Sequence, residues 1–385
     1  MMKGFLAAML ACLGIGWADA ASALQVRFYP VGRVYSYALS EDHDAHSLMV
    51  QNVAILNDGA APVTLTSIAV QLLQGERVID ERRLGAPELE RAAGNGAVLT
   101  GDMWRMLSFQ FGGDRLLPSN MHLGRSTTLA PGEALLFGSQ IFAYRGQRDS
   151  VRIVVNDNAA QGSIPIRSMM SQTEYQFPLQ GSWYAGSGPG FNSPHRWSPM
   201  EEFAFDLVQV DARGRTYRHA GTRFTDYYAY GKPVFAAADG VVVSVIANQS
   251  EDTHAMQQPN ETVEAYYTRL RQDQMTRVAQ GLAGIGGNCV VIDHGNGEYS
   301  FYAHLKPGSV RVLTGDHITR GQQLGQVGSS GNSTEPHLHF QVCDGPEPLH
   351  CAGIPIRFEQ GHDTLRNPAH AAQVGDFMSR PEAAH

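Results

Sequence analysis

The stretch that decides the fold of the second half of the chain is Pro336-His337-Leu338-His339-Phe340-Gln341-Val342, in which polar and apolar side chains alternate. Successive side chains of a β-strand point to opposite faces of its sheet. The imidazoles of His337 and His339 therefore lie side by side, with Leu338 and Phe340 on the other face. Such a pair can bind a metal and handle a proton, or it can be a solvated strand face. The surrounding segments decide between these interpretations.

Strand patterns continue upstream of this stretch. They cover 232–246, where Asp239-Gly240 is a hairpin-turn signal, and then 288–305, 308–312 and 322–327. One segment differs, because Asn260 to Gly281 has helical spacing with Asn260 as a candidate cap. We predict a compact antiparallel β domain over 176–355 with a helical insertion at about 258–283, followed by a C-terminal tail at 356–385. The inserted helix is either a surface helix packed on the sheet or a wall of the cleft.

An ordered series of short motifs leads to the HxH strand. The series is Gly287-Asn288-Cys289-Val290-Val291-Ile292-Asp293-His294-Gly295-Asn296-Gly297, Tyr302-Ala303-His304-Leu305, and Gly328-Ser329-Ser330-Gly331-Asn332-Ser333. Over roughly residues 192–345 it resembles the lysostaphin-like zinc metallopeptidases, a family of peptidoglycan endopeptidases. The chain has no HExxH helix, which excludes a thermolysin-type site.

The resemblance implies one zinc ion per chain, held by a histidine, an aspartate and the second histidine of HxH. In this sequence the ligands correspond to His195, Asp206 and His339. The family's usual spacing is His-x-x-x-Asp, whereas ten residues separate His195 from Asp206. A rival pair is His219 and Asp226, but there Arg223 stands where the aspartate belongs, and its cation would repel zinc.

The resemblance also implies that His304 and His337 act beside the metal without binding it. Three protein ligands leave one zinc position for water. One histidine can accept the water proton and later protonate the leaving amine, while the other hydrogen-bonds the oxyanion. The sequence leaves open which histidine is the base. His294 lies in an Asp-His-Gly-Asn-Gly turn, and we interpret it as structural.

The first part of the chain shows a different pattern. Residues 21–175 predict an immunoglobulin-like β-sandwich of unknown role, with a short helix at 86–94. The expected strands are 24–29, 47–56, 62–73, 134–144 and 150–155. Only three of the fifteen histidines precede residue 190, so we expect no catalytic group there. The segment 176–194, rich in Gly, Ser and Pro, predicts a crossing between two domains.

The first twenty residues have the composition of an export signal. Lys3 precedes a short apolar run, and Ala18-Asp19-Ala20 is a small-x-small cleavage site. We therefore expect an exported protein, in the periplasm or outside the cell, with no transmembrane segment after cleavage. In that oxidising environment we expect a disulfide between Cys343 and Cys351, which flank a turn-rich loop, and a buried, unpaired Cys289.

The expected function is hydrolysis of amide bonds in peptidoglycan peptides. The net charge of −8 argues against a nucleic-acid partner, because phosphate binding requires clustered cations. One alternative is a metal-free module that binds or activates other cell-wall hydrolases. Another is a secreted zinc protease that cleaves proteins. The sequence does not indicate a regulatory protein partner.

Overall fold

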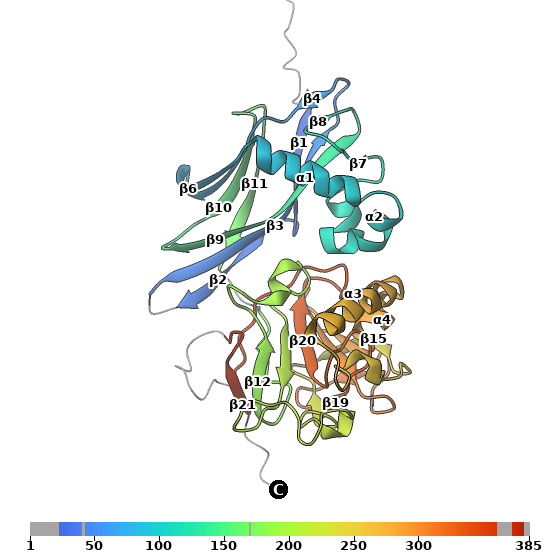
Figure 1. Ribbon diagram of the computed structural model, residues 1–385. Helices are drawn as coiled ribbons and strands as arrows, with labels where there is room; N and C mark the ends of the chain where they lie inside the picture. The colour runs from blue at the N-terminus through green and yellow to red at the C-terminus, as the bar shows by residue number, and fades with distance from the viewer. Residues whose placement is uncertain (1–22, 41–42, 169–170, 360–371, 381–385) are drawn as a thin grey trace, which may run out of the picture.

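The computed structural model describes residues 23–40, 43–168, 171–359 and 372–380. The expected export signal at 1–20 lies outside these residues. The described chain forms two large β-sheets, one above the other in Figure 1. Within the described ranges, no helix is both long and apolar enough to cross a membrane.

The first sheet has nine strands in the order β6-β5-β10-β11-β2-β3-β9-β7, with β1 paired to β3. The strands are β1 (Leu24–Tyr29), β2 (Val34–Ser40), β3 (Ala45–Asn57), β5 (Ile68–Gln74), β6 (Arg77–Leu84), β7 (His122–Leu123), β9 (Glu133–Arg145), β10 (Ser150–Val155) and β11 (Ala160–Arg167). A further two-stranded sheet joins β4 (Val63–Thr64) to β8 (Thr128–Leu129).

This sheet consists of two parts joined by a short parallel contact between β11 and β2. Within the parts the strands pair antiparallel, except β7 and β9, which are parallel. Both parts contribute to one core, with Val50 and Ile55 from β3, Leu72 from β5 and Ile153 from β10. The shared core shows that the two parts pack face to face. The β class is confirmed, while the immunoglobulin-like assignment stays a prediction.

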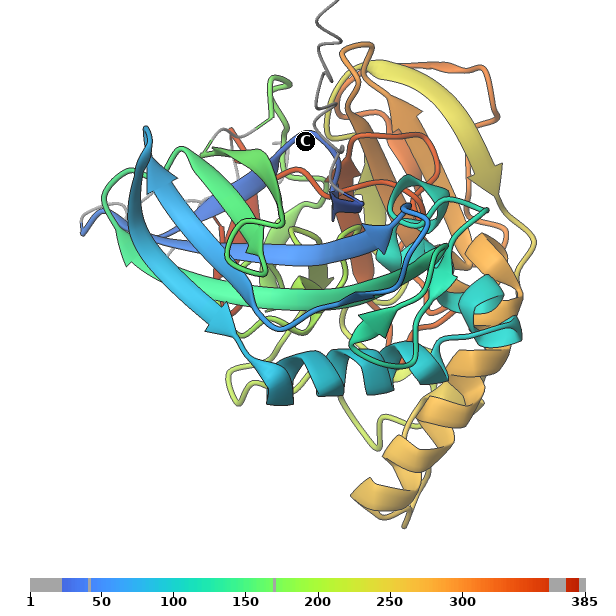
Figure 2. The same ribbon diagram turned by 90° about the horizontal axis from the view of Figure 1, so that it is seen from above.

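The helix expected at 86–94 is longer than predicted, and a second helix follows it. Helix α1 (Ala86–Val98) is followed by α2 (Asp102–Leu107) and by the 3-10 turns η1 (Ser108–Phe111) and η2 (Gly113–Arg115). Figure 2 shows α1 running along the edge of the first sheet, and the chain after it reaching the helices of the second sheet. The segment from α1 to η2 lies between β6 and β7 in the sequence.

The second sheet has eight strands in the order β18-β15-β16-β17-β20-β13-β12-β21. They are β12 (Gly181–Ser187), β13 (Phe205–Val208), β15 (Gly240–Ile246), β16 (Asn288–Asp293), β17 (Tyr299–Leu305), β18 (His317–Ile318), β20 (Leu338–Cys343) and β21 (Phe377–Arg380). A two-stranded sheet pairs β14 (Pro233–Phe235) with β19 (Gln323–Gln326). Three 3-10 turns complete this part: η3 (Pro194–Trp197), η4 (Phe224–Asp226) and η5 (Thr253–Ala255).

Three expectations need correction. The expected crossing at 176–194 contains β12, and the expected tail at 356–385 contains β21, which pairs with β12. Asp239-Gly240 does not close a hairpin, because β14 pairs with β19 while β15 pairs with β16 and β18. In each case the partner strand is distant in sequence, and local turn chemistry does not reveal it.

The helical insertion lies between β15 and β16, as expected. It forms α3 (Val263–Ala279) and α4 (Gly281–Gly286). The cap of α3 is Thr262, whose side chain accepts a hydrogen bond from the Ala265 amide, and not Asn260. Thr262 has extended backbone angles, as N-caps require, whereas Asn260 has a positive φ of 65°.

The alternation along the HxH strand divides the second sheet into two faces. Leu338 and Phe340 of β20 pack in the main core together with Phe205 and Leu207 of β13. The residues between them, including His339, therefore point to the opposite face. At the end of β20 the disulfide Cys343–Cys351 closes the following loop.

Candidate active site

Two adjacent strands, β13 and β20, place polar side chains on the same face of the second sheet, next to β17. Asp206 of β13 is directly opposite His339 of β20, and His339 is directly opposite Ala303 of β17. Directly opposed residues on neighbouring strands have their side chains about 5 Å apart. This register brings Asp206 and His339 together, although 133 residues separate them in sequence.

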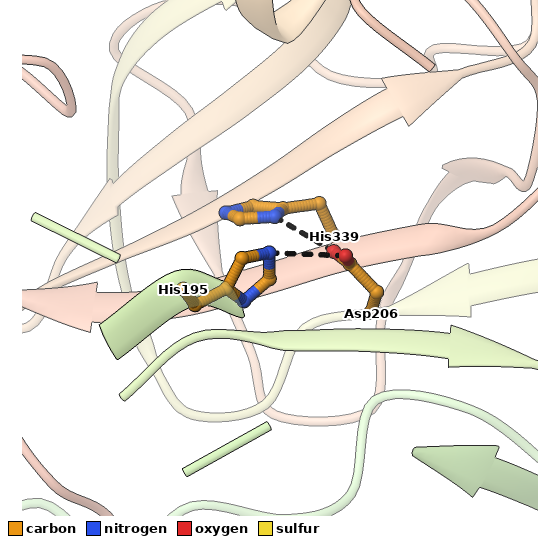
Figure 3. A group of neighbouring side chains, drawn as sticks. All are labelled: His195, Asp206 and His339. Carbon is orange, nitrogen blue, oxygen red and sulfur yellow. Dashed lines mark hydrogen bonds and ion pairs between the residues drawn. The ribbon is translucent and has the colours of Figure 1, made fainter. Parts of the chain in front are cut away.

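The third member of the group comes from outside the sheet. His195 lies in η3, and its Nε2 atom is 3.0 Å from Asp206 Oδ2. On the other side, His339 Nδ1 is 2.9 Å from Asp206 Oδ1. Figure 3 shows the two imidazoles meeting the two oxygens of one carboxylate. The donor atoms of His195, Asp206 and His339 all lie within 4.8 Å of one another.

The remaining ring nitrogens of the two histidines show that this donor set fits zinc. His195 Nδ1 is 3.2 Å from the Ala204 carbonyl oxygen, which can only accept, so Nδ1 carries the proton. His339 Nε2 faces the side-chain oxygen of Gln341 at 3.0 Å, while the Gln341 amide nitrogen faces the Pro348 carbonyl. In the neutral form of each ring, the nitrogen that faces Asp206 is therefore the one with the lone pair. Histidine ligands of zinc are held in this way, and two imidazoles with one carboxylate are a usual zinc set.

His304 and His337 lie together beside this group. Their ring centroids are 4.6 Å apart, and His304 lies 5.9 Å from His339 by the same measure. Each Nδ1 is 2.8 Å from a backbone carbonyl oxygen, that of Ser330 for His304 and that of Glu335 for His337. Both rings therefore carry a proton on Nδ1, and in its neutral form each ring can accept a second proton on Nε2. Nε2 of His337 also lies 3.4 Å from Asp206 Oδ1. This arrangement suits two groups that transfer protons.

The backbone at His304 is strained, since its φ is +61°. A positive φ is unfavourable for a residue with a Cβ atom, and such residues gather at functional sites. The neighbouring β16–β17 register is also irregular between Asn288 and Val290. The hydrogen bond to Ser330 holds the ring in this conformation.

Charges within the site change the proton affinities of these groups. Burial opposes a charge on His195, but the Asp206 carboxylate outweighs it and raises the His195 pKa to about 9. Burial likewise opposes a charge on Asp206, but His195 and His337 hold its pKa well below the ordinary value. Burial, with His337 and His339 nearby, keeps the pKa of His304 well below its ordinary value. Burial also opposes a charge on His337, but Asp206 outweighs it and raises that pKa. The site therefore holds one firm anion and three histidines, His195, His304 and His337, whose affinities for a proton differ.

These residues line a cavity of about 350 Å³. Its walls come from the second sheet and its loops, from the turn η1 and from the helical insertion. They include Phe109 and Gln110 of η1, Gln274 and Val278 of α3, Ile285 of α4, Asn332 and Thr334 before the HxH strand, and Leu349 in the disulfide loop. The insertion is thus a wall of the cleft, which settles the alternative that the sequence left open. Phe109 and Gln110 were not anticipated, since nothing in their local sequence points to a site 230 residues away.

The other residues considered from the sequence lie elsewhere. His219 is exposed, and Asp226 is buried in an ion pair with Arg223 at 3.2 Å. Neither lines the cavity around His339. His294 bonds to the Asp239 carbonyl and to Ser300, which agrees with a structural role, and Cys289 is buried and unpaired.

Residues 217–350 match the model of peptidase family M23. The chain is 27% identical over 183 residues to the peptidoglycan DD-endopeptidase ShyA of Vibrio cholerae, covering 47% of this chain and 30% of that protein. It is 30% identical over 167 residues to ShyC of the same organism, covering 42% of this chain and 29% of the relative.

A shorter match, 35% identical over 77 residues, covers 20% of this chain and 17% of the DD-carboxypeptidase/endopeptidase Mpg of Neisseria meningitidis. The chain therefore spans less than a third of the length of these relatives. The solved catalytic domain of lysostaphin from Staphylococcus simulans is 19% identical over 45% of this chain and 88% of its own, with a TM-score of 0.25. The family match contains His304, His337 and His339, and it begins after His195 and Asp206.

Proposed function

We propose, from the peptidase family M23 domain that this chain contains, that the protein is a zinc-dependent endopeptidase that hydrolyses amide bonds in the peptide stems or cross-bridges of peptidoglycan. Two relatives carry the name peptidoglycan DD-endopeptidase, which favours this polymer as the substrate. The bond within the peptide is left open.

The observation that carries the proposal is the group His195, Asp206 and His339, with donor atoms within 4.8 Å of one another at the bottom of a cavity. An arrangement of two histidines and one carboxylate leaves a fourth position of a tetrahedral ion open to the cavity. We assign these three residues as the ligands of one zinc ion per chain.

Zinc in such a site polarises a substrate carbonyl and lowers the pKa of water toward neutrality. The chain's own residues then handle the protons. In its neutral form, His304 or His337 accepts a proton on Nε2 from the attacking water and later returns it to the leaving amine. The other histidine, when protonated, donates a hydrogen bond to the carbonyl oxygen that gains negative charge.

Of the two alternatives, the site disfavours the metal-free binding module and leaves the secreted zinc protease to be separated by its substrate. A metal-free binding module has no need for a complete ligand set, and here His195, Asp206 and His339 are all present with oriented rings. A protease acting on secreted proteins would use the same chemistry, so only the substrate separates it from a cell-wall enzyme. Cleavage of peptidoglycan would place the protein in the periplasm or outside the cell.

The test is digestion of purified peptidoglycan sacculi and of casein by the purified protein, with mass analysis of the products. We expect soluble muropeptides with newly formed peptide ends, no cleavage of casein, and no products from His339→Ala. Intact sacculi together with cleaved casein would replace the cell-wall assignment by the protein-protease alternative.

A further inference from the structure

Strand β3 of the first sheet is buried on both of its faces. Leu48 and Val50 point into the core of the first sheet. Ser47 and Gln51, which alternate with them, point the other way, yet they are 0% and 1% exposed. They are covered by the loop that carries His195, between β12 and β13 of the second sheet.

The contacts between β3 and this loop are polar and direct. The Gln51 side-chain amide donates to the Arg196 carbonyl oxygen at 2.7 Å and to Glu202 Oε2 at 2.9 Å. In return, Arg196 Nη2 donates to Ser47 Oγ at 2.6 Å. Arg196 and Glu202 are only 3% and 7% exposed, so these bonds are shielded from water. Breaking one leaves a buried polar group without a partner, which is costly.

These contacts hold the loop at two positions, Arg196 and Glu202. Arg196 is the residue after His195, and Glu202 lies four residues before Asp206. One side chain, Gln51, binds both points. The loop itself has only the short turn η3 and a few local hydrogen bonds, so its position depends on what it packs against. The family match begins at residue 217 and therefore does not include this loop.

We propose that Ser47 and Gln51 are positioning residues for the metal site, so that the first sheet helps to hold His195 in place for zinc. This inference rests on the proposed zinc function. It gives the first sheet a role in the site, in place of an unknown role as a separate module. The hydrogen bond from Asn52 Nδ2 to the Gln110 carbonyl, at 3.3 Å, connects β3 to the cavity wall as well.

The test compares Gln51→Leu with Gln71→Leu in the full chain. Gln71 lies on β5 of the same sheet and bonds to Glu81 and Arg152, away from the His195 loop. Zinc affinity is measured by competition with a chelating dye, and the visible spectrum of the Co²⁺-loaded protein reports the ligand geometry. We expect Gln51→Leu to weaken zinc binding about 10- to 100-fold, as changes beside metal ligands do, and to alter the Co²⁺ spectrum. Gln71→Leu should change neither.

Ser47→Ala provides a second variant that removes one hydroxyl only, in case Gln51→Leu does not fold. It should weaken zinc binding in the same direction while circular dichroism stays unchanged. The proposal is overturned if whichever of Gln51→Leu and Ser47→Ala folds binds zinc as tightly as Gln71→Leu, with an unchanged Co²⁺ spectrum. A wild-type chain that binds no zinc would instead contradict the proposed function.

Discussion

At the scale of single residues, the four histidines of the site differ in what their second nitrogen touches. His195 and His339 each place a ring nitrogen 3.0 and 2.9 Å from the two oxygens of Asp206, whereas His337 Nε2 is 3.4 Å from Oδ1 and His304 bonds to a backbone carbonyl. On this difference rests the proposal that one pair binds zinc and the other transfers protons. The assignment separates metal content from activity, and both can be measured.

His337→Ala should lower the rate of peptidoglycan cleavage by about 100- to 10,000-fold, the range for loss of a general acid or base. Zinc content should remain one ion per chain, because His195, Asp206 and His339 are unchanged. Zinc by mass spectrometry and cleavage by muropeptide release would be measured on the same sample. The matched control is His317→Ala, an exposed histidine on β18, which should behave as wild type. Full activity of His337→Ala would remove His337 from the mechanism.

Glu202 predicts a pH effect on stability. Burial raises its pKa from 4.5 to about 7, with Arg196 and Gln51 opposing the rise. Between pH 4.5 and pH 7 the Glu202 carboxyl keeps its proton in the folded chain and releases it in the unfolded chain. The contribution of Glu202 to the stability of the fold therefore falls as the pH rises through this range. Glu202→Gln removes this titration. Its free energy of unfolding relative to that of the wild type should therefore rise by at most about 3 kcal/mol as the pH increases from 4.5 to 7. Urea unfolding of both zinc-free proteins at pH 4.5 and pH 8 measures this change. If the variant and the wild type differ in unfolding free energy by the same amount at the two pH values, the raised pKa of Glu202 is contradicted.

The sequence predicts part of this site and misses the rest for a physical reason. His337 and His339 are found because a strand repeats every two residues, and His304 follows from the family motif. Gln341 could have been found by the same spacing, since it lies two residues after His339. Gln51 and Phe109 could not, because their contacts with the site depend on how two sheets far apart in sequence pack together.

At the scale of elements, the site depends on the register of β13, β20 and β17. A shift of one residue would turn His339 into the core and Leu338 toward the cavity. The apolar pairs Phe205–Phe340 and Leu207–Leu338 oppose that shift, because they fix the core face of both strands. The sequence predicted β1 and β10 at their observed bounds, since their apolar pattern is local. It placed a crossing at β12 and a tail at β21, because β12 is rich in Gly and Ser and β21 is a short edge strand, so both have a weak strand pattern.

The disulfide at the end of β20 predicts a stability effect. It closes a loop with a sequence separation of 8, and a bond of this loop size contributes about 2–3 kcal/mol through the unfolded state. The double variant Cys343→Ser with Cys351→Ser should lose about that much. Urea unfolding with and without a reductant measures it. The reductant should lower the urea midpoint of the wild type and leave that of the variant unchanged. Equal midpoints for the two proteins with and without reductant would show that the disulfide contributes little.

At the scale of the whole molecule, the two sheets share a buried interface that contains polar contacts. Besides the contacts of β3, the Tyr29 hydroxyl donates to the Cys351 carbonyl at 3.0 Å, and Phe109 packs with Met200 and Val278. Domains joined by small, exposed interfaces unfold separately, whereas domains with a large buried interface unfold together.

We therefore expect one cooperative transition by differential scanning calorimetry. Zinc should raise the midpoint temperature of this single transition, because a ligand that binds only the folded state stabilises the entire cooperative unit. Two transitions, of which only one responds to zinc, would show that the sheets fold independently.

The central claim is that His195, Asp206 and His339 form one zinc site that drives cleavage of peptidoglycan peptides. The most direct measurement is a titration of chelator-treated protein with zinc while muropeptide release from sacculi is followed. The account predicts no release without metal, a linear rise on adding zinc, and a plateau at one zinc per chain. Release that persists in the metal-free protein, or that does not return with zinc, would contradict it.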